Sequence, residues 1–233
     1  LGNSGNDSFV ATSASDGIDE ITGGTGSDTV DYSVITNSSN KIIATLSQTG
    51  DSTVDLATGD DDTINGIENI IGGAGDDTFT GSALENTLDG GSGTDEVRYD
   101  YDNGAGVTVD LENDTAVENS GVTDTLTSIE NIIGSSYDDN FTTANDETNV
   151  IDGGTSANET NGDTIDYSTR NNSINVTLNG STTATVDITG EQNDQIKNIE
   201  NVTGSTNHDT ITGDNLENTL LGKAGNDELS GQG

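Results

Sequence analysis

The sequence contains no cysteine, proline, methionine or tryptophan, and only five of its 233 residues are lysine or arginine. Without cysteine there is no disulfide framework, thiol catalysis or thiolate metal site. No apolar run approaches the roughly 20 residues that a membrane-spanning helix needs, so we expect no membrane insertion. No signal peptide is recognisable. The chain begins and ends inside a repeat, and we therefore expect it to be a fragment of a longer array.

Acidic residues dominate what is present. The chain has 43 aspartates and glutamates and a formal net charge of -38, with an apolar fraction of only 27%. Taken alone, this composition is typical of a disordered chain or of a solvated acidic surface. Nucleic acids and anionic membranes are excluded as partners, because such a surface repels them. Cations are the partners that this charge favours.

A nonapeptide of the form G-G-x-G-x-D-x-U-x, where U is a large apolar residue, recurs along the chain. Residues 23–31 (GGTGSDTVD), 72–80 (GGAGDDTFT) and 90–98 (GGSGTDEVR) match it fully, and 2–10 and 222–230 each lack one glycine. Looser copies occupy residues 81–89, 134–142, 204–212 and 213–221. A disordered acidic chain would not keep this register, so the repeat favours a folded array.

The nine-residue spacing predicts an all-β fold, a right-handed parallel β-roll or β-helix. Six residues of glycine-rich turn and three of strand make half a coil, so residues 18 apart stack on neighbouring coils. Asp77 with Asp95 and Asp209 with Asp227 have this spacing. Stacked strands lie ~4.8 Å apart. Two carboxylates at that distance repel by ~1 kcal/mol in water and by a few kcal/mol when partly desolvated. A divalent cation between them reverses the sign.

Calcium suits these loops because it accepts about six to eight oxygen ligands in flexible geometry. Glycines can adopt positive φ and direct carbonyl oxygens toward one point. With no cysteine and a single histidine, His208, which we expect to face solvent, zinc lacks ligands. The predicted ligands for several Ca²⁺ ions are Asp7, Asp19, Asp28, Asp77, Asp95, Asp139, Asp163, Asp209 and Asp227, with the turn glycines Gly24, Gly26, Gly73, Gly75, Gly91, Gly93 and Gly225.

On these repeats the chain resembles the RTX (repeats-in-toxin) family of calcium-binding nonapeptide proteins. The resemblance implies a parallel β-roll with calcium ions between loops of the same edge. It also implies export through a type I secretion channel before folding, and thus a secreted protein of the bacterial cell surface. The family includes proteases, lipases, toxins, epimerases and S-layer proteins as well as giant adhesins.

A longer period groups the nonapeptides into residues 1–31, 72–98, 134–166 and 204–231. The groups are joined by recurring segments. These contain DTVDYS (28–33) and its two copies, alternating stretches at 52–59, 107–114 and 174–181, and IENIIG (67–72, 129–134) or IENVTG (199–204). We interpret residues 1–233 as one continuous β-solenoid, with coils of longer apolar strands between the groups. The third group contains an insertion, so we expect its Asp139 and Asp163 to bind calcium most weakly.

Several recurring residues have structural interpretations. Asn86, Asn149 and Asn218 replace the repeat aspartate, and their amides can continue the stack by hydrogen bonds without metal. Tyr32, Tyr99 and Tyr167 are expected to pack over the solenoid edge rather than to stack on a ligand. A thin core is predicted from Ile64, Phe79, Leu88, Val97, Phe141, Ile151, Ile211 and Leu220.

No catalytic site is predicted. The sequence has no nucleophile elbow and no H-E-x-x-H motif, and we expect nothing to converge on Arg98 or Arg170 beside their tyrosines. The expected function is calcium-dependent folding and stiffening of a surface adhesin, as a monomeric segment. Two alternatives stay open: an ice- or glycan-binding module, or the secretion module of an exported enzyme or toxin. The irregular residues that precede the aspartates do not favour a regular ice-binding face.

Overall fold

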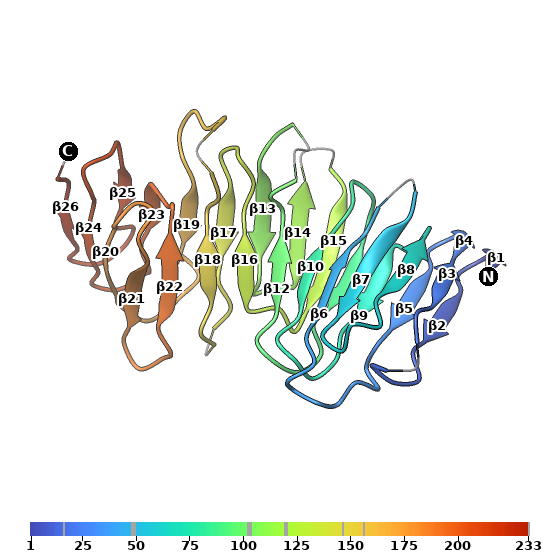
Figure 1. Cartoon of the computed structure of the whole chain (residues 1–233). Helices are drawn as coiled ribbons and strands as arrows, with labels where there is room; N and C mark the ends of the chain where they lie inside the picture. The colour runs from blue at the N-terminus through green and yellow to red at the C-terminus, as the bar shows by residue number, and fades with distance from the viewer. Residues whose placement is uncertain are drawn as a thin grey trace. The chain divides into compact units, whose positions relative to one another are not determined.

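The computed structural model describes residues 1–15, 17–47, 50–101, 104–118, 121–145, 147–155 and 157–232. In these ranges the chain forms 26 short strands and no helix, and hence none that could span a membrane (Figure 1). The backbone clusters into two compact units, Leu1–Arg98 with Ser120–Asn131 and Tyr99–Asn119 with Ile132–Gly233. The predicted all-β fold of parallel β-roll type is confirmed. Its continuity over residues 1–233 stays a prediction.

The first unit contains strands of two large sheets. One has the order β12-β10-β6-β7-β8-β3, the other has the order β2-β5-β9-β11-β15, and β1 pairs with β4. The strands of the first order are β12 (Glu96–Arg98), β10 (Thr78–Thr80), β6 (Ile42–Thr45), β7 (Ser52–Leu56), β8 (Asp62–Asn65) and β3 (Glu20–Thr22). The others are β2 (Ser8–Val10), β5 (Thr29–Asp31), β9 (Asn69–Ile71), β11 (Thr87–Asp89), β15 (Thr123–Thr127), β1 (Asn3–Ser4) and β4 (Gly24–Thr25).

The second unit has the same plan. Its strand orders are β26-β24-β20-β21-β22-β18 and β14-β13-β17-β19-β23-β25. The first order contains β26 (Glu228–Ser230), β24 (Thr210–Thr212), β20 (Ile174–Thr177), β21 (Ala184–Ile188), β22 (Asp194–Lys197) and β18 (Val150–Asp152). The second contains β14 (Thr115–Glu118), β13 (Val107–Asp110), β17 (Asn140–Thr142), β19 (Thr164–Asp166), β23 (Asn201–Thr203) and β25 (Thr219–Leu221); β16 is Asn131–Ile133.

Each nonapeptide forms a three-residue strand at its x-U-x positions, and the U residue is buried or half-buried except in the last nonapeptide, where Leu229 is exposed. Consecutive nonapeptides alternate between sheets, so β10 pairs with β12 while β11 lies in the other sheet. Phe79 is in register with Val97, and Ile211 with Leu229. The predicted 18-residue coil is therefore confirmed. Because each strand buries one side chain, packing depends on neighbouring coils rather than on any one strand.

The predicted core is buried except at its last residue. Of the eight side chains named, Leu220 alone is only half-buried, because β25 is the last strand of its sheet order. Tyr32, Tyr99 and Tyr167 are completely buried, which confirms packing and excludes stacking on an external ligand. His208 is exposed, as predicted.

The segments between the nonapeptide groups are antiparallel, and here the prediction of purely parallel coils is wrong. β6, β7 and β8 form an antiparallel meander, with Ile43 opposite Asp55 and Thr53 opposite Thr63. β20, β21 and β22 form a second meander, and β13 pairs with β14 in the same sense. Short polar turns separate these strands, and turns of that length permit hairpins but no parallel crossover.

The meanders also correct the alignment of the alternating stretches. Residues 107–114 and 174–181 contain the first meander strands, β13 and β20, whereas residues 52–59 contain the middle strand, β7. An alternating pattern predicts a half-buried strand but not its partner or its direction. The three similar stretches were therefore expected to be equivalent strands, although one of them is the middle strand of its meander.

Candidate metal sites

Repeat aspartates on neighbouring coils form hydrogen-bonded columns. The backbone N–H of Asp77 donates to Oδ1 of Asp95 at 2.7 Å, and the N–H of Asp95 donates to Oε2 of Glu130 at 2.8 Å. The N–H of Glu130 returns a bond to the carbonyl of Asp95 at 3.2 Å. Each column therefore runs Asp, Asp, Glu, with carboxylates on successive coils.

The column recurs in other groups. Asp7 donates to Asp28 at 2.8 Å, and Asp28 donates to Glu68 at 2.8 Å. The third column is Asp139, Asp163 and Glu200, with distances of 2.8 and 2.9 Å, and Asp209 donates to Asp227 at 3.0 Å. The predicted aspartate pairs are thus brought together. Asp19 does not join them, because its N–H bonds Asp62.

Sequence reasoning missed the glutamates of these columns. Glu68, Glu130 and Glu200 are the middle residues of the three I-E-N motifs, and each accepts the N–H of the last aspartate in its group. The recurrence of this motif was visible in the sequence. Because each I-E-N motif follows the last aspartate of a nonapeptide group, a contact between that aspartate and the glutamate could have been predicted from the sequence.

The turn glycines allow the loops to approach closely. Gly91 has φ +89° and Gly93 has φ +146°, and a Cβ there would lie 2.5 Å from the carbonyl oxygen of Gly73 and 2.3 Å from that of Gly75. The Gly73 carbonyl group accepts the N–H of Ser92 in the neighbouring loop at 3.0 Å, and the role of these glycines as calcium ligands stays a prediction. Gly73 and Gly75 themselves lie outside the positive-φ region. The remaining predicted glycines, Gly24, Gly26 and Gly225, have positive φ.

The first glycine of each nonapeptide leaves room for the carboxylate. A Cβ on Gly90 would lie 2.4 Å from Oδ2 of Asp95 and 2.3 Å from the carbonyl oxygen of Ser128. An equivalent Cβ would lie within 2.5 Å of the aspartate Oδ2 at Gly2, Gly23, Gly72, Gly134, Gly153, Gly204 and Gly222. Any side chain at this position would displace the carboxylate, so the glycine is required by packing.

Some carboxylate oxygens in the columns are buried without a partner. Asp28, Asp95 and Asp163 are at most 1% exposed, and Oδ2 of each accepts no hydrogen bond. By contrast, the two oxygens of Asp77 accept the N–H groups of Ile42 and Gly73, at 2.7 and 2.8 Å. A buried oxygen without a partner is destabilising, and a cation at this place would satisfy it.

Burial and mutual repulsion raise the pKa values of the column acids. Burial and, to a smaller extent, the charges of Asp77 and Glu130 together raise the pKa of Asp95 to about 7, against the lowering effect of the hydrogen bond from the Asp77 N–H. The pKa of Asp139 rises to about 6 and that of Asp163 to about 10, again chiefly through burial. The ionised columns are therefore unfavourable without a positive charge nearby.

One further acidic cluster lies in the third group. Glu159, Asp163 and Glu200 each offer a carboxylate oxygen, and these oxygens lie within 4.8 Å of one another. Within the described ranges this is the one such group of three. Glu159 belongs to the insertion that led us to expect weak binding here, and the insertion thus adds an acidic side chain that the expectation did not include. A groove of about 880 Å³ runs beside Glu159 and Glu200.

Backbone groups satisfy two of the three predicted asparagines, Asn86 and Asn218, whereas Oδ1 of Asn149 accepts no hydrogen bond. Oδ1 of Asn86 accepts the N–H of Ser82 at 2.6 Å, and its Nδ2 donates to the carbonyl of Glu68 at 2.8 Å. Asn218 makes the same two kinds of bond, with Asp214 and Glu200. These contacts support the interpretation that asparagine continues the stack without metal.

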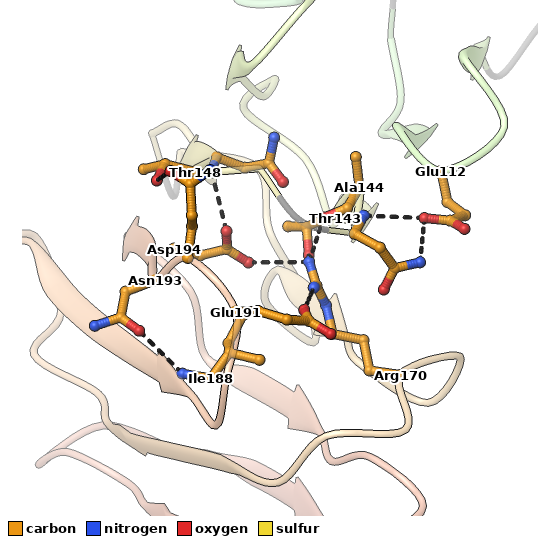
Figure 2. A network of polar contacts seen from close by, with 12 residues as sticks. Glu112, Thr143, Ala144, Thr148, Arg170, Ile188, Glu191, Asn193 and Asp194 are labelled. Carbon is orange, nitrogen blue, oxygen red and sulfur yellow. Dashed lines mark hydrogen bonds and ion pairs between the residues drawn. The ribbon is translucent and has the colours of Figure 1, made fainter.

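Arg170 is the centre of a buried polar network (Figure 2). Its guanidinium donates to Oγ1 of Thr143 at 2.7 Å and to the carbonyl of Ala144, and it pairs with Glu191 and, at 3.6 Å, with Asp194. The expectation that nothing converges on Arg170 is wrong. All these partners belong to the protein and hold the guanidinium in place, which is a packing role.

Comparison with protein-family models and with curated protein sequences finds no match for this chain.

Proposed function

We propose that this chain is a calcium-dependent structural segment of a secreted bacterial β-roll protein, of the kind found in large surface adhesins. The observation that carries the proposal is the set of buried, unpartnered carboxylate oxygens on Asp28, Asp95 and Asp163, within a chain of net charge -38. Such oxygens need a positive charge, and the five lysines and arginines are far too few to supply one at every coil. The resemblance of the nonapeptides to RTX repeats supports the same ion.

The donor set fits calcium. It consists of aspartate and glutamate carboxylates together with glycine carbonyl groups directed at the next loop, and oxygen ligands of this kind suit a hard divalent cation. In the first unit, Asp77, Asp95 and the carbonyl groups of Gly73 and Gly75 would hold an ion. In the second unit, Asp209 and Asp227 are the corresponding pair.

Calcium would act on folding and on stiffness together. Each coil packs only on its neighbours, so no packing beyond the adjacent coils offsets the repulsion between them. An ion held between two loops joins coils that otherwise repel, and its binding free energy adds directly to the stability of the folded chain. A chain of this kind stays extended where calcium is scarce, which suits export, and becomes rigid outside the cell.

Circular dichroism of the whole chain tests this proposal. In chelator at pH 8 the spectrum should be largely that of a coil, and about 1 to 10 mM Ca²⁺, the range of extracellular calcium modules, should convert it to β structure. Magnesium at equal concentration should act weakly, because it requires stricter octahedral geometry. A β spectrum of equal intensity in chelator and in calcium would overturn the proposal.

A further inference from the structure

We propose that Glu159, Asp163 and Glu200 form a solvent-accessible divalent-cation site, in which the inserted segment adds a third carboxylate to the last two acids of the third column. One carboxylate oxygen of each lies within 4.8 Å of those of the other two. The three residues come from different places: the inserted segment, the residue before β19 and the residue before β23. The inference depends on the proposed function only for the identity of the ion, Ca²⁺.

Asp163 provides a second, independent observation. Its side chain is completely buried, and Oδ1 accepts the N–H of Asp139 at 2.8 Å, while Oδ2 accepts no hydrogen bond. One oxygen of a buried carboxylate in this cluster is therefore left for a ligand. The neighbouring acids repel a charge on it, and a bound cation would satisfy this oxygen and offset that repulsion together.

Both glutamates are held in position. Oε2 of Glu200 accepts the N–H of Asp163 at 2.9 Å, which fixes the side chain beside the aspartate. Glu159 precedes three residues that a single carboxylate holds: Asp138 accepts the N–H groups of Thr160, Asn161 and Gly162 at 2.7, 3.0 and 3.1 Å. The inserted segment is thus anchored immediately after Glu159. A preorganised set of ligands binds a cation without first ordering a loop.

The other columns show what the insertion adds. Asp28 with Glu68 and Asp95 with Glu130 make the same bond from aspartate N–H to glutamate, at 2.8 Å each. In the described residues neither pair has a third acidic side chain as close as Glu159 is to its partners. The insertion therefore converts a recurring pair of acids into a set of three carboxylates, and carboxylate oxygens are ligands that Ca²⁺ prefers.

Solvent reaches this site. Glu159 and Glu200 are half-buried and line the groove of about 880 Å³ together with Gly162, Glu217 and Leu220. An ion here would exchange with bulk solution more readily than one enclosed between two loops. When bound, it would tie the inserted segment to the coil of β23.

Calcium binding by the whole chain, measured by isothermal titration and by equilibrium dialysis, tests the site. Glu159→Gln should lose one bound Ca²⁺ per chain, or weaken that ion by at least the roughly 10- to 100-fold that loss of a partner supporting a metal ligand costs. Glu217→Gln removes the same charge from the same groove outside the cluster, and should bind as the wild type does. Isotherms of Glu159→Gln and the wild type that superimpose would overturn the inference.

A second variant keeps the test valid if Glu159→Gln fails to fold. Glu200→Gln keeps an oxygen that can accept the Asp163 N–H and removes only the charge, so it should lose the same ion. Broadening of the Gly162 amide by Mn²⁺, which should disappear in both variants, reports the site directly. If calcium fails to induce β structure but Glu159→Gln still loses an ion, the site stands and the proposed function fails. If calcium induces folding and neither variant loses an ion, the proposed function stands and the site is overturned.

Discussion

The column that begins at Asp77 and the column that begins at Asp139 stabilise their buried acids in different ways. Around Asp77, in the glycine-rich group 72–98, the carboxylate accepts only backbone N–H groups. Around Asp139, in the glycine-poor group 134–166, Ser135 replaces the second glycine and donates both its N–H and its hydroxyl to the carboxylate, at 2.6 and 2.9 Å. Ser205 does the same for Asp209, at 2.7 and 2.8 Å.

The difference shows that a buried acid can be stabilised from within the chain or from outside it. Where serine supplies a hydroxyl, the first carboxylate of the column needs less from an ion. In both groups the unpartnered oxygen lies on the second aspartate, Asp95 or Asp163, and only Asp163 has the glutamate of the insertion beside it. In the glycine-rich group 72–98, an ion would be held only by groups of the repeat loops. In the group 134–166, Glu159 offers a further carboxylate.

The largest effect is expected from Asp95→Ala. This change removes the acceptor of the Asp77 N–H and one acid of the column, leaving a buried donor that costs about 1–3 kcal/mol. The calcium midpoint for folding should rise about tenfold or more, because site affinity follows the number of charged ligands. Calcium titrations followed by circular dichroism measure it.

Asn86→Ala is the matched control, since Asn86 is equally buried in the same group. It should lower the free energy of unfolding by about 1–3 kcal/mol through its lost hydrogen bonds. Its calcium midpoint should rise only by the amount that this loss of stability explains. Equal shifts for the two variants would show that the aspartate is not a ligand.

The next effect concerns pH. The folded-state pKa values of Asp95 and Asp139 are about 7 and about 6, above the ordinary value of 3.8. The folded chain therefore binds more protons than the unfolded chain between these values, so its stability is highest at acidic pH and falls as pH rises through about 4 to 7. In chelator, β structure should be greater at pH 5 than at pH 8.

Calcium should remove this decline, because it binds the ionised carboxylates and takes the place of the protons. Denaturant unfolding at the two pH values, with and without Ca²⁺, measures both slopes. A metal-free chain whose stability rises from pH 5 to pH 8 would contradict the account of the columns as repelling, buried acids.

The smallest effect tests the serine of the irregular group. Ser135→Ala deletes the hydroxyl that bonds Asp139 and should cost about 1 kcal/mol, with a larger loss in chelator than in calcium. Ser181→Ala, at an exposed position in the same unit, should change neither. Chemical denaturation measures the free energy of unfolding of each variant. An equal loss for Ser135→Ala in chelator and in calcium would show that the serine hydroxyl does not take the place of an ion.

Periodicity made part of this structure predictable. Neighbours that lie 18 residues apart, such as Asp77 and Asp95 or Phe79 and Val97, follow from counting, because the repeat has a fixed length and a fixed period of burial. The pairing direction of β6 to β8 did not follow, since alternating side chains suit either direction. Glu159 lies in a segment with no period, and only the fold brings it to Asp163 and Glu200.

Arg170 escaped for a similar reason. It stands three residues after Tyr167, at the position where the first copy has the buried apolar residue Ile35 after Tyr32. The expectation was that nothing would converge on a charged residue at this position. Its partners Glu191 and Asp194 lie in and beside the meander, whose existence the sequence pattern did not reveal.

The hydrogen bonds of the columns all run in one direction along the chain, and this direction bears on how the repeats arose. Each aspartate gives its N–H to the following coil and takes one from the preceding coil, and the I-E-N glutamate receives the last of these bonds. A block of chain that runs from the first aspartate of a group to its glutamate thus contains donor and acceptor in matched order. Such a block can be duplicated whole by recombination and fold behind its own copy without any new contact having to evolve, which accounts for a chain built from long, similar blocks.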